Sequence, residues 1–147
     1  MLSPIIKNKI LIGPQYASEL ILELEKVKKD ISIIMYVWTK YPEDPFCDPS
    51  RITSLILDAH RRGLKVRILT NFSATCDWLC SLGLNARLIA GSRIVHAKMV
   101  ILDSNKIFVG SHNFSRSAMT SNIEVSTLHT DLSDVDPLLR YFNSLWL

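Results

Sequence analysis

The chain has 147 residues, enough for one domain with its own core, and we expect a single domain spanning residues 1–147. Hydrophobic residues make up 48% and charged residues 21%, which excludes the compositions typical of disordered or fibrous chains. The formal net charge of +3 is too small to indicate a polyanionic partner by itself.

Strands and helices are predicted to alternate over the first two thirds of the chain. Runs of β-branched residues predict strands. Apolar residues that recur about every 3.6 positions, with polar residues on the opposite face, predict helices. Ser50 is expected to cap the second helix and Gly63 to end it. The predicted elements are strand Lys9–Ile12, helix Tyr16–Lys29, strand Ile31–Trp38, loop Thr39–Pro49, helix Ser50–Gly63, strand Lys65–Leu69, helix Cys76–Leu82 and strand Ala86–Ile89.

The last third is predicted to begin with a hairpin. Ile94–Leu102 and Lys106–Val109 flank a turn of Asp103, Ser104 and Asn105. Three further elements are expected, which are a helical turn at Phe114–Met119, a strand at Ile123–Leu128 and a closing helix at Pro137–Leu147. The order of elements predicts an α/β fold with a mixed, mostly parallel sheet flanked by helices.

The sequence shows no secretory signal, and no apolar run approaches the ~18 residues that span a bilayer. We therefore expect a cytoplasmic protein with no membrane partner. Cys47, Cys76 and Cys80 are an odd number of cysteines with no C-x-x-C pair, which suits a reducing compartment. A zinc site of these cysteines with a histidine is a disfavoured alternative, because such sites usually show paired close spacings.

Two ionisable side chains are predicted on one face of the first hairpin strand. His96 and Lys98 are two residues apart and project from the same face, whereas Val95, Ala97, Met99 and Ile101 point the other way into apolar surroundings. An imidazole and an ammonium in the middle of a fold are costly unless they meet an anion. The pair therefore indicates a site for an anionic group, although alone it would be more typical of a core histidine beside a lysine.

A second polar pair follows the hairpin. Ser111 and Asn113 are also two residues apart, and a helical turn is expected just after them. A hydroxyl, an amide and a helix start suit a phosphate oxygen. Gly110 is expected to let a ligand approach the backbone closely. Ser111 and Asn113 alone would be ordinary turn residues.

Together these residues resemble the signature of the phospholipase D superfamily. His96-x-Lys98, four residues, Asp103, six residues and Gly110-Ser111-x-Asn113 match H-x-K-x4-D-x6-G-S-x-N without departure. Six fixed positions would arise by chance with a probability on the order of 10⁻⁶ to 10⁻⁵. The order of elements upstream is also similar to the small bacterial endonucleases of this superfamily, which carry one motif per chain and act as homodimers. The resemblance implies a phospholipase D-like fold.

The resemblance also implies a metal-independent phosphodiesterase site shared by two chains. One His96 would attack phosphorus and form a covalent phosphohistidine, while the other His96 protonates the leaving oxygen. Lys98 and Asn113 of both chains would hold the phosphate oxygens, with Ser111 assisting. Because the two lysines neutralise charge as a metal would elsewhere, no metal or other cofactor is expected.

Glu124 and Asp103 complete the candidate catalytic residues. The family often carries a glutamate beyond the asparagine, so Glu124 would accept a hydrogen bond from His96 and fix its tautomer. An exposed strand carboxylate is the alternative for Glu124. Asp103 belongs to the motif, but the strand directs it away from His96 and aspartate is favoured in turns, so we expect it to support the structure.

Three further residues are candidates for substrate binding. Arg93 and Arg116 lie close to the motif in the sequence and are expected to contact substrate phosphates. His112 lies between two motif residues and is expected at the rim of the site, with a surface loop histidine as the alternative.

Three functions stay open at this point. A nuclease acting on DNA or RNA is favoured, because the chain is short, carries one motif and is basic near it. A phospholipid phosphodiesterase is disfavoured, since such relatives usually have two motifs in one long chain. The third is a nucleic-acid-binding module with weak or partner-dependent activity, against which the intact motif argues.

Overall fold

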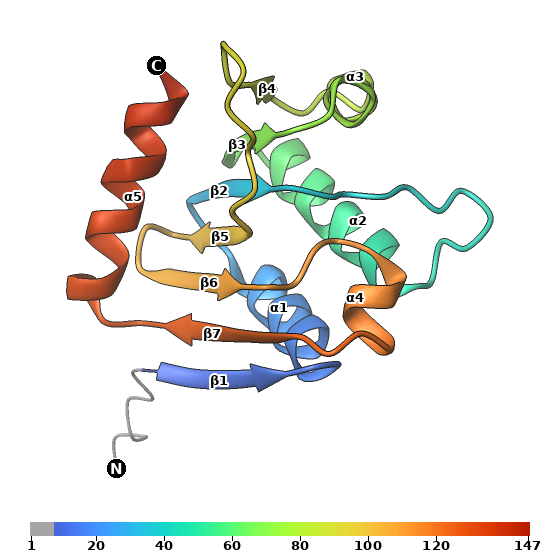
Figure 1. Ribbon diagram of the computed structural model, residues 1–147, viewed down its shortest axis with the longest axis horizontal. Coiled ribbons are helices and arrows are strands. Elements are labelled where there is room, and N and C mark those ends of the chain that lie inside the picture. The colour runs from blue at the N-terminus through green and yellow to red at the C-terminus, as the bar shows by residue number, and fades with distance from the viewer. Residues whose placement is uncertain (1–7) are drawn as a thin grey trace.

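A seven-stranded sheet organises residues 8–147, the part of the chain that the computed structural model describes (Figure 1). The strand order is β1-β7-β6-β5-β2-β3-β4. The strands are β1 (Asn8–Ile12), β2 (Asp30–Met35), β3 (Lys65–Thr70), β4 (Ala86–Leu88), β5 (Met99–Leu102), β6 (Lys106–Gly110) and β7 (Val125–His129). The helices are α1 (Gln15–Lys26), α2 (Asp48–Arg61), α3 (Ser73–Ser81), α4 (Arg116–Thr120) and α5 (Leu132–Trp146).

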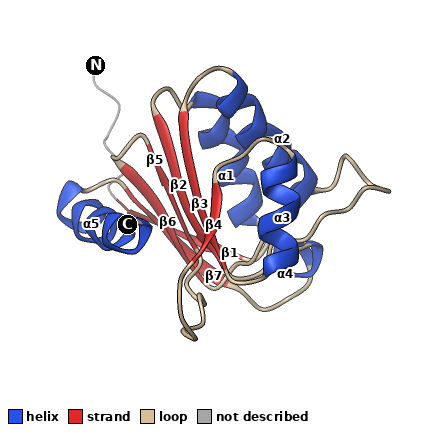
Figure 2. Ribbon diagram, turned by 90° about the horizontal axis from the view of Figure 1, so that it is seen from above, coloured by secondary structure: helices blue, strands red, loops and turns tan. Residues whose placement is uncertain are grey.

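Helices cover the sheet on both faces, which explains why residues 31–35 of β2 are all buried. Helices α1 to α4 lie on one side of the sheet and α5 lies on the other (Figure 2). Because side chains alternate along a strand, Ile33 packs in the core with residues of α1 and α2, and Ile34 packs in the core with residues of α5. The sheet therefore has one hydrophobic core on each of its two faces.

The predicted α/β fold with a mixed sheet is confirmed, but its mostly parallel character is wrong. Among residues 8–147, only β2 with β3 and β3 with β4 pair in parallel. The pairs β1–β7, β2–β5, β5–β6 and β6–β7 are antiparallel. Parallel neighbours need a crossover, and in residues 8–147 only α2 and α3 connect strands that pair in parallel, whereas α4 connects the antiparallel neighbours β6 and β7. After β4 the chain returns antiparallel to β2 and continues through a hairpin.

Helices α2 and α5 both begin earlier than the sequence prediction. Helix α2 begins at Asp48 with Pro49 in its first turn, and the Ser50 hydroxyl donates to the Asp44 carbonyl instead of capping the helix. Helix α5 begins earlier than Pro137, because the Asp131 side chain accepts a hydrogen bond from the Ser133 amide at 3.0 Å. Within residues 8–147, no helix is both long and apolar enough to cross a bilayer.

One edge of the sheet gathers the loops that carry the motif. Strands β2, β3 and β6 end at this edge, and β5 and β7 begin there, as their pairing directions require. Strand β5 starts only at Met99, so residues 93–98 form an irregular segment in front of it. The motif residues therefore lie on loops held by a rigid sheet, a common arrangement for functional sites.

Candidate active site

His96 and Lys98 lie together in the irregular segment before β5. The alternation predicted for a strand persists there in part, because Val95 and Met99 are buried in the core beneath α5 whereas His96 is exposed. Ala97, which was expected in apolar surroundings, is exposed. The Lys98 Nζ atom lies 3.3 Å from each ring nitrogen of His96. The His96 imidazole and the Lys98 ammonium therefore lie next to each other at the end of the sheet.

The Lys98 ammonium is partly buried without a close counter-charge. Among residues 8–147, no carboxylate lies within 4.0 Å of its Nζ atom. Burial lowers the pKa of Lys98, and the charge of Glu124 acts in the opposite direction. The Tyr36 ring lies 5.2 Å from Nζ and offers a π face. A cation in this setting would be stabilised by an anionic ligand.

Two residues outside the motif hold the His96 segment in place. The Asn71 Oδ1 atom accepts a hydrogen bond of 2.9 Å from the Val95 amide. The Tyr36 ring packs 4.6 Å from the His96 ring and 5.4 Å from the Phe72 ring. Tyr36 and Asn71 directly follow β2 and β3, so their place at the carboxyl ends of neighbouring parallel strands is the sequence signal that could have indicated them.

Asn113 lies next to the chain that leaves β2. Its Oδ1 atom accepts a hydrogen bond of 3.1 Å from the Val37 amide, and an isolated bridge joins Trp38 to Phe114. Within the described part of the chain, the Asn113 Nδ2 group makes no hydrogen bond. Because the amide orientation follows from the Val37 contact, the free end of Asn113 is a donor suited to a phosphate oxygen.

Ser111 and Gly110 fasten the loop to β7. The Ser111 hydroxyl donates to the Val125 carbonyl at 3.2 Å and accepts from the Val125 amide at 3.0 Å. These contacts favour a positioning role for Ser111 over direct phosphate contact. A Cβ atom on Gly110 would overlap Ser126. Gly110 is therefore required because β6 and β7 lie too close together here for a side chain. The expectation that it makes room for a ligand is wrong.

Within one chain, the negative charge of Glu124 interacts with the Lys98 ammonium. Its carboxylate accepts a hydrogen bond of 3.3 Å from the Asn122 side chain. Burial lowers the pKa of Lys98 and of His112, and the Glu124 charge opposes that lowering in both. No hydrogen bond joins Glu124 to His96 in residues 8–147. The expected contact that would fix the His96 tautomer is thus absent from the single chain.

Comparison with known proteins identifies the family. Residues 20–146 match the family described as "Cardiolipin synthase, PLD-like domain". The chain belongs to the phospholipase D-like family. The expected family resemblance and the phospholipase D-like fold are confirmed.

Three relatives show how far the likeness extends. The structure of Nuc from Salmonella typhimurium, a phospholipase D family member, has a TM-score of 0.76 and 20% identity over 95% of both chains. NucT from Helicobacter pylori has a TM-score of 0.75 and 22% identity over 95% of this chain and 94% of that one. The mitochondrial cardiolipin hydrolase of Chlamydomonas reinhardtii is 27% identical over 101 residues, which cover 65% of this chain and 45% of that protein. This chain spans less than half the length of the curated relatives it matches.

Asp103 serves the fold at the opposite end of β5, although it is part of the phospholipase D-like motif. Its carboxylate accepts hydrogen bonds from the amides of Lys28, Lys29 and Asp30 at 2.8 to 3.3 Å. Asp103 and Ser104 both have positive φ angles, near 54° and 56°, as the hairpin turn requires. These contacts contradict a catalytic place for Asp103 and match the expected structural role.

His112 is buried, so its expected place at the rim of the phospholipase D-like site is wrong. Its ring is fully enclosed and stacks on Tyr16 with centroids 4.3 Å apart and planes within 6°. The Nδ1 atom lies 2.6 Å from the Ser126 hydroxyl and Nε2 lies 2.9 Å from the Gly13 carbonyl. Burial lowers the pKa of His112, against the effects of the Gly13 hydrogen bond and Glu124. This residue joins β1, β6 and β7.

The two candidate arginines have different surroundings. The Arg116 guanidinium pairs with Glu43 at 2.7 Å and lies 4.1 Å from the centre of the Tyr41 ring. Arg116 thereby holds the loop after β2, which leaves it poorly placed to bind a phosphate. Arg93 is exposed and makes no ion pair among residues 8–147, so its guanidinium is available to a ligand.

The cysteines do not form a recognisable metal site. Cys76 is buried in α3, Cys80 is exposed on the same helix, and Cys47 lies just before α2. In the described part of the chain, no three His, Cys, Asp or Glu side chains converge as metal ligands would. The zinc alternative therefore has no supporting geometry in residues 8–147.

Proposed function

We propose that this protein is a phosphodiesterase that cleaves nucleic acid through a phosphohistidine formed on His96, without a metal ion. The observation that carries the proposal is the pairing of an exposed imidazole with a partly buried ammonium 3.3 Å away that has no close carboxylate. The pair offers a nucleophile and a positive charge to the same phosphate. The Asn113 amide group adds a further donor.

The proposed reaction has two steps at phosphorus. A neutral His96 nitrogen attacks phosphorus, a P–N bond forms, and the P–O bond to the leaving group breaks. The leaving oxygen takes a proton from a second imidazole, which becomes neutral. Water then attacks the same phosphorus and gives its proton to that second imidazole, while the P–N bond breaks and frees His96. Lys98 neutralises the charge on the non-bridging oxygens in both steps.

The second imidazole is proposed to come from another copy of the chain. His112 is enclosed, His129 lies 3.0 Å from Asp134, and His60 lies at the end of α2, at the opposite edge of the sheet. None of these three side chains contacts His96. A two-fold dimer would bring a second His96 to the same phosphate.

An exposed apolar surface supports this dimer. Ile12, Ile123 and Val125 flank the loops at the motif edge, with exposed fractions of 59%, 101% and 50%. Apolar side chains gathered at one place on a surface are typical of an interaction site. A second copy seated there would bury them beside Glu124.

Nucleic acid is the favoured substrate. The likeness to Nuc and NucT extends over nearly the whole of each chain, in keeping with the resemblance to small bacterial endonucleases of the superfamily. The alternative is a phospholipid, which the match to a cardiolipin hydrolase favours, although this chain covers only 45% of that protein. A binding module with weak or partner-dependent activity is the third possibility.

A substrate panel tests the proposal. The purified protein would be incubated with single- and double-stranded DNA, RNA, cardiolipin and phosphatidylcholine, each in excess chelator and with added Mg²⁺. We expect cleavage of nucleic acid at similar rates in both conditions, because Lys98 neutralises charge in place of a metal. Strict dependence on Mg²⁺ would contradict the mechanism, and cleavage of cardiolipin alone would contradict the substrate.

A further inference from the structure

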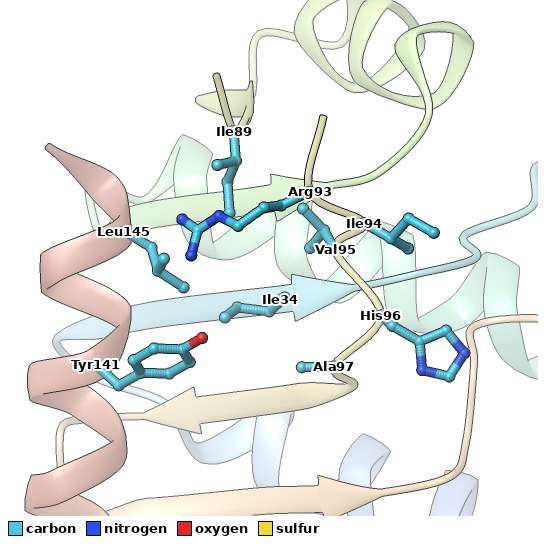
Figure 3. Close-up of a pocket in the computed structure, with 9 residues that line it drawn as sticks. All are labelled: Ile34, Ile89, Arg93, Ile94, Val95, His96, Ala97, Tyr141 and Leu145. Carbon is cyan, nitrogen blue, oxygen red and sulfur yellow. The ribbon is translucent and has the colours of Figure 1, made fainter. Parts of the chain in front are cut away.

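A cavity of about 260 Å³ lies between the His96 segment and the C-terminal half of α5 (Figure 3). Its walls are mainly apolar and come from β2, from the segment before β5 and from α5. Ile34, Val95 and Leu145 contribute to these walls, and Arg93 and Tyr141 are the polar residues on the α5 side. The cavity is slightly smaller than the roughly 300–1,000 Å³ of pockets that hold drug-sized ligands. Its size suits one ring system.

Two hydrogen-bond donors enter this cavity without a partner. Figure 3 shows the Arg93 side chain extending toward α5 and the Tyr141 hydroxyl directed into the cavity. Neither side chain makes a hydrogen bond or an ion pair within residues 8–147. Both would gain from a ligand that carries acceptor atoms, and an aliphatic chain could not supply these.

The cavity and the candidate nucleophile lie on two sides of one short segment. Residues 94–97 form a wall of the cavity, and the His96 ring points away from Tyr141 (Figure 3). Because His96 is itself one of the residues that line the cavity, a phosphodiester held at its ring would lie beside the cavity. This arrangement favours an occupant covalently joined to the reacting phosphate.

We propose that the cavity binds the unpaired base of a nucleotide next to the scissile phosphate. This inference deepens the proposed function and rests on it. The flat faces of the base would pack on Ile34 and Leu145, while its acceptor edge meets Arg93 and Tyr141. A base can enter only after it leaves its stack and its pairing partner, which costs less in a single strand. The cavity thus selects single-stranded nucleic acid.

Oligonucleotide binding tests the cavity separately from catalysis. Affinity would be measured by fluorescence anisotropy at one salt concentration, in a His96→Asn background that cannot cleave. The probes are a short labelled single strand and the duplex of the same sequence. We expect the single strand to bind about tenfold more tightly, and Leu145→Trp, which fills the cavity, to remove about tenfold of that affinity. Duplex binding should change less than about twofold.

Two variants complete the test. Leu132→Trp introduces the same side chain at an exposed position at the start of α5, away from the cavity, and should leave both affinities unchanged. Tyr141→Phe removes only the hydroxyl and should weaken single-strand binding about threefold, even if Leu145→Trp does not fold. Equal affinity for strand and duplex, or single-strand binding unchanged in Tyr141→Phe, would overturn the inference. Binding to cardiolipin vesicles would be measured with the same proteins, and a Leu145→Trp protein that loses vesicle binding but keeps its single-strand affinity would also overturn the inference. Failure of cleavage would affect only the proposed function.

Discussion

The substitution His96→Asn should reduce the rate of phosphodiester cleavage by at least about 10⁴-fold, with little change in stability. The ring serves twice in a two-fold site, as nucleophile in one copy and as proton donor in the other. Its side chain is exposed, so its removal leaves no cavity in the core. The initial rate on a labelled oligonucleotide and the free energy of unfolding are the two measurements.

A matched variant separates the site from general effects of the substitution. His60→Asn makes the same change at the end of α2, at the far edge of the sheet, and should keep the wild-type rate. The wild-type rate should also pass through a maximum as the pH is varied, because one imidazole must be neutral while the other is protonated. A His96→Asn protein that still cleaves within tenfold of the wild-type rate would contradict the assignment.

The substitution His112→Ala should lower the free energy of unfolding by about 3 kcal/mol. It creates a cavity beside Tyr16 and leaves the Gly13 carbonyl and the Ser126 hydroxyl without their partner. Chemical denaturation measures the loss, and His60→Ala, at a half-buried position, should cost less than about 1 kcal/mol. A loss below about 1 kcal/mol for His112→Ala would show that the ring does not join β1 to β7.

His112 should also make stability depend on pH. The Gly13 carbonyl can only accept, so Nε2 donates to it and Nδ1 accepts from Ser126, which satisfies a neutral ring. Burial lowers the pKa of His112, whereas in the unfolded chain a histidine titrates near about pH 6.5. The unfolded state therefore binds more protons below that pH, and the free energy of unfolding falls as the pH is lowered toward the folded pKa. The fall should be smaller in His112→Ala.

Local patterns predicted the parts of the fold that depend on neighbouring residues. The period-two alternation placed His96 and Lys98 on one side and Val95 and Met99 on the other, even though the regular strand starts only at Met99. The turn at Asp103 followed from its residue types. The direction of β5 could not be predicted, because the irregular connection after β4 allows either direction.

Contacts between distant segments account for what the sequence did not predict at the site. His112 lies 99 residues from Gly13 and 14 from Ser126, and those partners turn a loop histidine into a core residue. Arg116 is likewise held by Glu43 across 73 residues. The motif indicated His96, Lys98 and Asn113 as candidates, but its spacing carried no information on Tyr36 and Asn71, which directly follow two other strands earlier in the chain.

Trapping of the covalent intermediate tests the central proposal most directly. The protein would be mixed with an oligonucleotide labelled with radioactive phosphorus at the scissile phosphate, quenched in alkali during the first turnover and digested into peptides. We expect the label on the peptide that contains His96, stable in alkali and released by acid, and no label in His96→Asn. Cleavage during that turnover with no labelled peptide, or with the label on another residue, would contradict it.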